Sequence, residues 1–202
     1  MIETQKRLPI LWYSNAANYV TMFGCLLSLA SCYFAVSGNL KLSVTCFILA
    51  GVCDLFDGFV ARKIQRTDEE KKFGIALDTV VDVVSFAVTP VVIVCCVEGM
   101  PWYSLIIGAF YIAAAVVRLA YFTASTHPEH RKWYAGLPVT YIALILPIVL
   151  LIGWSPLILA AVLVTGVLFV VGVPIPKPRG VWYGVFPVIA IALIVLTAVL
   201  IP

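Results

Sequence analysis

Residues 54–82 read DLFDGFVARKIQRTDEEKKFGIALDTVVD, and four of their five aspartates lie on two stretches that are otherwise apolar enough to cross a membrane. These four are Asp54, Asp57, Asp78 and Asp82. An ionised side chain at bilayer depth costs at least about 2.5–3.5 kcal/mol on insertion scales. Four acids placed together therefore need compensation, and bound cations are the natural source of it.

The composition of the chain is that of a membrane protein. Of its 202 residues, 63% are hydrophobic and only 11% are charged, and the mean hydropathy is +1.08. We expect an all-α integral membrane protein, a single embedded domain over residues 1–202 in which six to seven helices form a bundle across the bilayer. The polar, basic start MIETQKRLP predicts no cleavable signal peptide. The candidate spans are about 15–37, 42–61, 73–97, 101–124, 136–153, 156–173 and 181–201.

The distribution of Lys and Arg predicts the orientation of the bundle. Cations precede the first span and occupy the second, fourth and sixth loops, whereas the intervening loops hold only Lys41. Cytoplasmic loops carry an excess of Lys and Arg, so we expect the N-terminus and the second loop to face the cytoplasm. The net charge of +3 reflects this asymmetry, and nucleic acid is not an expected partner. The cations are Lys6, Arg7, Arg62, Lys63, Arg66, Lys71, Lys72, Arg131, Lys132, Lys177 and Arg179.

The spacing of the acids predicts two facing helical stripes. Residues at i, i+3, i+4 and i+7, or at i, i+4 and i+8, share one face of a helix. An antiparallel helix pair joined by a cytoplasmic loop over 63–72 would bring the two stripes together. Small residues on the stripes would let a ligand approach the backbone, although helix packing is the alternative role for a lone glycine. The stripes are Asp54, Asp57, Gly58 and Ala61 on one helix, and Gly74, Asp78 and Asp82 on the other.

The acids define the expected cofactor. Oxygen ligands without His or Cys favour a hard divalent ion over zinc. We expect Mg²⁺ or Mn²⁺, with two ions per site, because two ions can stabilise both the attacking and the leaving oxygen of a phosphoryl displacement. The six cysteines lie in apolar runs without a CxxC pair and are interpreted as small hydrophobic packing residues.

DLFDGFVAR followed by GIALDTVVD resembles the signature of the CDP-alcohol phosphatidyltransferase family, D-x-x-D-G-x-x-A-R…G-x-x-x-D-x-x-x-D, at every fixed position. The gap between Arg62 and Gly74 is longer than is usual in the family, and the surplus falls in the charged TDEEKK stretch. SNAANYVTMFG (14–24) resembles the family's PNxxT start, with Ala17 in place of the proline. DVVSFAVTP (82–90) and YAGLPVT (134–140) resemble segments of the members that use serine.

The resemblance implies transfer of a phosphatidyl group from CDP-diacylglycerol, or an ether-lipid equivalent, to an alcohol with release of CMP. It implies that Asp54, Asp57 and Asp78 ligate metal and that Asp82 is both a partial ligand and the catalytic general base; a covalent aspartyl-phosphate is the alternative route. It also implies that the protein forms a homodimer and that it contacts membrane lipids. The residues expected to contact the CDP-lipid are Asn18, Thr21, Gly58, Ala61, Arg62 and Gly74.

L-serine is the expected acceptor, and its carboxylate needs a cation. Arg118 lies well inside an apolar run, where it could bind a carboxylate or phosphate or anchor its helix. Arg62 could likewise contact a phosphate or anchor its helix in the lipid headgroups. Ser85, Arg131 and Lys132 complete the expected acceptor-binding set. The histidines of THPEHRKWY, His127 and His130, are interpreted as a solvated loop rather than a metal site.

Two alternative functions remain open at this stage. A family member that uses glycerol 3-phosphate or inositol phosphate would need further cations for the second phosphate. An ion-coupled transporter would also place acids inside the membrane, but the sequence has no inverted repeat or paired broken helices.

Overall fold

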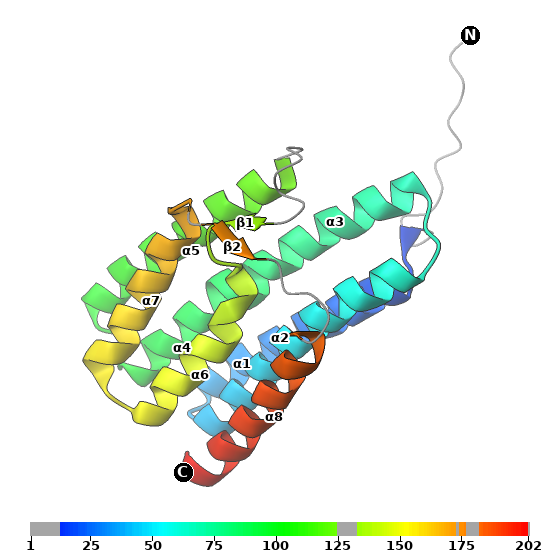
Figure 1. Ribbon diagram of the computed structural model, residues 1–202. Coiled ribbons are helices and arrows are strands. Elements are labelled where there is room, and N and C mark those ends of the chain that lie inside the picture. The colour runs from blue at the N-terminus through cyan, green and yellow to red at the C-terminus, as the bar shows by residue number, and fades with distance from the viewer. Residues whose placement is uncertain (1–12, 125–132, 173, 177–181, 202) are drawn as a thin grey trace.

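The computed structural model describes residues 13–124, 133–172, 174–176 and 182–201, which form a bundle of helices with two very short strands (Figure 1). The order of the elements is α1 (Ala16–Val36), α2 (Leu40–Lys63), α3 (Asp68–Asp82), η2 (Val83–Val88), α4 (Thr89–Val97), α5 (Trp102–Ala124), β1 (Trp133–Ala135), η4 (Val139–Tyr141), α6 (Ile142–Ile152), α7 (Ser155–Val170), β2 (Pro174–Pro176) and α8 (Trp182–Leu200).

Four helical segments are long and apolar enough to cross a membrane: Ala16–Val36, Leu40–Lys63, Asp68–Val97 and Trp102–Ala124. The other apolar helices, Val139–Ile152, Ser155–Val170 and Gly184–Leu200, are shorter than the roughly 20 residues that a span needs. The structure therefore confirms a helical integral membrane protein, and the count of six to seven spans stays a prediction.

The third span begins earlier than the sequence predicted. We expected a loop over 63–72, but α3 begins at Asp68, inside the charged stretch. A capping box starts the helix: the Glu70 backbone N–H donates to Thr67 Oγ1 at 3.2 Å, and the Thr67 backbone N–H donates to Glu70 Oε2 at 2.7 Å. The gap between Arg62 and Gly74 is longer than is usual in the family, and most of its extra residues are helical. Charged side chains are well placed in an exposed first turn.

The helix that begins as α3 continues into α4 through the π-helical turn η2. A π turn displaces backbone carbonyls from the regular helical ladder, so they need other donors. The Tyr111 hydroxyl of α5 donates to the Phe86 carbonyl at 2.8 Å, and Thr89 Oγ1 donates to the Val84 carbonyl at 2.9 Å. Both donors are buried, and they stabilise the turn directly after the last residue of α3.

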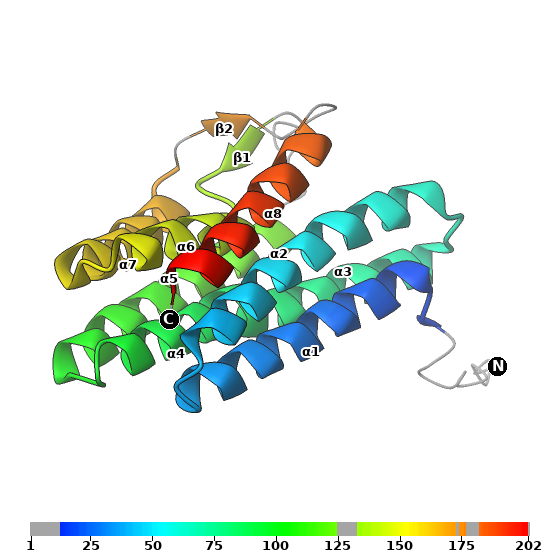
Figure 2. The same cartoon turned by 90° about the horizontal axis from the view of Figure 1, so that it is seen from below.

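Glycines allow the helices around the site to approach closely. A Cβ added to Gly51 of α2 would lie 2.7 Å from Ala143 Cβ of α6, and one added to Gly108 of α5 would lie 2.5 Å from Val91 Cγ1 of α4. Both distances are too short for carbon atoms in contact. α1 packs against both α2 and α3, and Figure 2 shows α8 lying over α2.

The two strands are the exception to the all-α prediction. β1 and β2 pair antiparallel, with Trp133 opposite Pro176 and Ala135 opposite Pro174. The chain then turns at Gly136, whose φ of +77° is a left-handed conformation that favours glycine. This short sheet connects the segment before α6 to the segment after α7.

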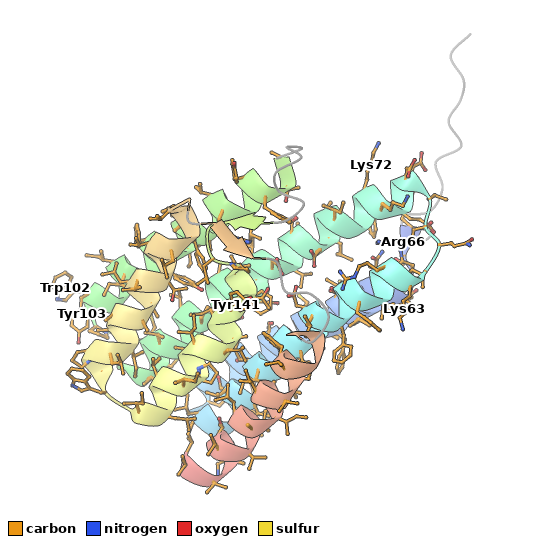
Figure 3. The ribbon with its side chains drawn as sticks, viewed as in Figure 1. Lys63, Arg66, Lys72, Trp102, Tyr103 and Tyr141 are labelled. Carbon is orange, nitrogen blue, oxygen red and sulfur yellow. The ribbon has the colours of Figure 1, made fainter. Side chains whose placement is uncertain are left out.

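The charged and aromatic side chains mark opposite ends of the bundle. Lys63, Arg66 and Lys72 lie at the end where α2 meets α3, whereas Trp102 and Tyr103 lie at the other end (Figure 3). Aromatic side chains are typical of membrane interfaces. The connection between α2 and α3, a short segment over 64–67, is therefore on the cationic side of the molecule.

Candidate active site

Three of the four aspartates converge between α2 and α3. Asp54, Asp78 and Asp82 can each present one carboxylate oxygen so that the three oxygens lie within 4.8 Å of one another. Asp57 lies about one turn further along α2 and is only 6% exposed. The antiparallel pair thus brings the two predicted stripes together, with three acids in one cluster and Asp57 beside it.

Two threonine hydroxyls from other parts of the chain hold the aspartates of α2. Thr21 Oγ1, from α1, donates to Asp57 Oδ2 at 2.5 Å. Thr140 Oγ1, from η4, donates to Asp54 Oδ2 at 2.8 Å. Sequence reasoning placed Thr21 at the site through the family motif. It singled out the segment 134–140, which ends in Thr140, only by its resemblance to members that use serine, and it did not reveal the contact with Asp54 across 86 residues.

A cavity of about 420 Å³ opens beside the three converging acids. Asp54, Asp78 and Asp82 line one side of it, and the segment 138–140 lines another. Arg118 of α5 also lines it, although this side chain is only 7% exposed. The cavity is therefore a polar space, walled by acids and at least one buried cation, within an apolar bundle.

A second cavity, of about 200 Å³, adjoins the first and shares Asp57, Gly58, Arg62, Ile75 and Asp78 with it. Its lining includes every residue that the resemblance assigned to the CDP-lipid: Asn18, Thr21, Gly58, Ala61, Arg62 and Gly74. It also includes Arg66, which sequence reasoning counted only as a loop charge. The cations Arg62 and Arg66 therefore border the same space.

Side chains of the site lie close to the backbone at Gly74 and Gly58. A Cβ added to Gly74 would lie 3.3 Å from Asn18 Oδ1 and 3.4 Å from Arg66 Nη1. A Cβ added to Gly58 would lie 3.5 Å from Arg62 Nη1, which is an ordinary van der Waals contact. Of these two contacts, the one at Gly74 is the tighter.

The structure separates the residues expected to bind the acceptor. Arg118 lines the larger cavity, and its Cζ atom lies 5.6 Å from the centroid of the Phe122 ring. Ser85 is buried in η2, accepts a hydrogen bond from Ser28 Oγ at 2.8 Å and lines a void of about 10 Å³ together with Asp54, Asp57 and Asp82. Other residues predicted from the sequence lie outside the described part of the chain: Lys6, Arg7, His127, His130, Arg131, Lys132, Lys177 and Arg179.

The acid cluster has the chemistry and the dimensions of a divalent-metal site. Mg²⁺ and Ca²⁺ bind oxygen ligands at about 2.0–2.6 Å, so two ligands of one ion lie at most about 5 Å apart. The three oxygens of Asp54, Asp78 and Asp82 satisfy this limit. The residues present therefore fit a hard divalent ion.

The comparisons with known proteins agree with this site. The model of the CDP-alcohol phosphatidyltransferase family matches residues 14–176, which span the acids and both cavities. The chain belongs to the CDP-alcohol phosphatidyltransferase family.

Curated relatives include three proteins named for serine products or substrates. The archaetidylserine synthase of Methanothermobacter thermautotrophicus is 27% identical over 153 residues, which cover 74% of this chain and 64% of the relative. The CDP-diacylglycerol–serine O-phosphatidyltransferase of Helicobacter pylori is 25% identical over 171 residues, covering 79% and 71%. The enzyme of the same name from Saccharomyces cerevisiae is 33% identical over 147 residues, covering 65% and 52%.

The cluster geometry predicts that Asp78→Asn weakens Mn²⁺ binding by at least about ten-fold, because even outer ligand-supporting groups typically contribute 10–100-fold to metal affinity. Electron paramagnetic resonance of free Mn²⁺ in titrations of the detergent-solubilised protein measures this change. Asp68→Asn is the matched control, since Asp68 is an exposed acid paired with Lys71 at 2.9 Å. Equal affinities for the two variants would contradict a metal site at Asp78.

Proposed function

We propose that the protein transfers a phosphatidyl group from CDP-diacylglycerol, or an ether-lipid equivalent, to the hydroxyl of L-serine, giving phosphatidylserine or its ether analogue and CMP. The observation that carries the proposal is the position of the acid cluster where two cavities adjoin. One cavity has the small residues and cations suited to a nucleotide diphosphate, and the other has room for an acceptor. Family membership and the names of the relatives support the same reaction.

The smaller cavity is proposed to hold the cytidine diphosphate group of the donor. Gly58, Ala61 and Gly74 leave room for it against the helix backbones. Arg62 and Arg66 border this space, and guanidinium groups bind phosphate oxygens strongly. The acyl or ether chains of the donor then extend from the site into the surrounding lipid.

Asp54, Asp57, Asp78 and Asp82 are proposed to hold two divalent ions, Mg²⁺ or Mn²⁺. When bound, such ions supply positive charge opposite the donor diphosphate and the departing CMP. The carboxylates hold the ligand positions on two helices that both pack against α1, and Thr21 and Thr140 donate hydrogen bonds to two of them. This arrangement explains how four acids are tolerated at this depth in the bundle.

The larger cavity is proposed to bind L-serine, with its carboxylate on Arg118. Asp82 then accepts the proton of the serine hydroxyl as its oxygen attacks the phosphorus nearest the lipid. A bond forms between that oxygen and phosphorus, the bond from the phosphorus to the bridging oxygen breaks, and the bridging oxygen leaves on CMP with the electron pair. Arg118 lines this cavity together with Arg62, and a guanidinium group can bind the carboxylate of an amino acid.

We also propose that the site faces the cytoplasm. The second loop and the neighbouring helix ends carry Lys63, Arg66 and Lys72 on the side that Figure 3 shows opposite Trp102. Excess positive charge is typical of the cytoplasmic side. The homodimer that the resemblance implies stays a prediction.

Activity is the direct test of this function. Purified protein supplied with CDP-diacylglycerol, L-serine and Mg²⁺ or Mn²⁺ is expected to release CMP, and excess chelator is expected to abolish the release until metal is added back. Inositol phosphate, glycerol 3-phosphate and glycerol serve as competing acceptors in parallel reactions. CMP release that is faster with one of these acceptors would overturn serine as the substrate, and full turnover in chelator would overturn the role of the metal.

The role of Asp82 can be separated from that of Asp78. Asp82→Asn is expected to lower CMP release about 10²–10⁴-fold at saturating serine and metal, because loss of a general base typically has this effect. It is expected to retain more Mn²⁺ affinity than Asp78→Asn. Rate and Mn²⁺ titrations on the same preparations test both points. An Asp82→Asn variant that turns over like the unmodified protein would transfer the base role to another residue.

The orientation predicts the labelling of single cysteines in a parent whose six native cysteines are replaced by alanine. A cysteine at Gln65, in the α2–α3 connection, is expected to react with an impermeant maleimide only from the cytoplasmic side, and one at Met100 only from outside. Both positions are exposed. Gln65 is preferable to Thr67 because Thr67 caps α3. The reverse labelling pattern would place the site on the outer face.

A further inference from the structure

Thr140 lies beyond α5 in the described part of the chain, and its side chain forms a hydrogen bond with one of the four aspartates. Its hydroxyl donates to Asp54 Oδ2 at 2.8 Å. Thr140 also lines the larger cavity together with Asp54. It therefore lies where the acid cluster and the proposed acceptor space meet.

The position of Thr140 is set by contacts with α7. The Leu137 backbone N–H donates to the Leu168 carbonyl at 2.9 Å, just beyond the pairing of β1 with β2. A Cβ added to Gly136 would lie 2.6 Å from the Phe169 carbonyl oxygen, so only glycine allows this approach. Pro138 follows with φ of −60°, and η4 then begins. The hydroxyl is thus held by backbone contacts rather than by a mobile loop.

We propose that Thr140 is a positioning residue for Asp54: its hydroxyl fixes the carboxylate of Asp54 in the orientation that completes the metal cluster with Asp78 and Asp82. The inference deepens the proposed function, because the same carboxylate serves the metals of that reaction. It assigns to the segment 136–140 a part in the site that the aspartate signature does not contain.

The physical basis is the rotational freedom of a carboxylate. Asp54 is half-buried and lies on a helix, so its χ2 torsion is broad unless a partner fixes it. A hydrogen bond to Oδ2 restricts that torsion and leaves the other oxygen for an ion. Groups that orient metal ligands in this way typically change metal affinity by 10–100-fold when they are removed.

The test is Mn²⁺ binding by electron paramagnetic resonance, with no substrate present. Thr140→Val keeps the shape and removes the hydroxyl, and it is expected to lower Mn²⁺ affinity about 10–100-fold. Thr140→Ser keeps a hydroxyl and is expected to bind Mn²⁺ within about three-fold of the unmodified protein. Thr140→Ala provides a second variant without the hydroxyl if the valine variant does not fold. Thr165→Val is the matched control, since Thr165 is a buried threonine of α7 that bonds only to the Ala161 carbonyl.

The outcomes separate this inference from the function it rests on. Unchanged Mn²⁺ affinity in folded Thr140→Val or Thr140→Ala would overturn the proposal, as would equal losses in the serine and valine variants, which would indicate packing rather than a hydroxyl. The CMP assay with serine is run on the same samples. If Mn²⁺ affinity depends on the Thr140 hydroxyl but the unmodified protein releases no CMP with serine, the positioning role stands and the proposed acceptor fails.

Discussion

The mutual repulsion of carboxylates inside a membrane is the constraint that governs this structure. Asp54, Asp78 and Asp82 bring oxygens within 4.8 Å of one another, which is unfavourable unless cations share the site. Two helices that both pack against α1 hold the carboxylates in place, and hydroxyls from α1 and η4 restrict two acids of the four. The remaining features of the bundle, including its close helix contacts and its polar cavities, serve to keep this cluster intact while leaving one side open to ligands.

The chemistry that the site can perform depends on its two adjoining cavities. They share Asp57 and Asp78, so whatever occupies one is adjacent to whatever occupies the other. The smaller cavity is bordered by Arg62 and Arg66, and the larger one includes Arg118. In-line displacement requires an attacking group on one side of the reacting phosphorus and a leaving group on the other. Two cavities with acids between them suit this arrangement.

The sequence predicted the parts of the site that depend on local spacing. The i, i+3 and i+4 intervals of the aspartates and glycines define helix faces, so the stripes followed from the spacing. The expected CDP-lipid contacts, including Asn18 and Thr21, came from the resemblance to the family. The contacts of Thr140 and Arg66 followed from neither, because the first contact depends on how α6 and α7 return to the site and the second on where α3 begins. The predicted start of α3 was wrong for a physical reason. Charged residues indicate a loop by composition, yet a capping box makes these residues the exposed first turn of the helix.

The π turn after Asp82 affects how the two halves of the helix, α3 and α4, are oriented. Its wider turn holds one more residue than an α-helical turn would, which rotates the face of α4 relative to the face of α3. The acid-bearing half can then face α2 while Thr89, Ile93 and Val94 of the following half are buried in the apolar core. The two halves therefore present different faces to the bundle, and the hydrogen bond from Tyr111 to the Phe86 carbonyl holds the turn between them.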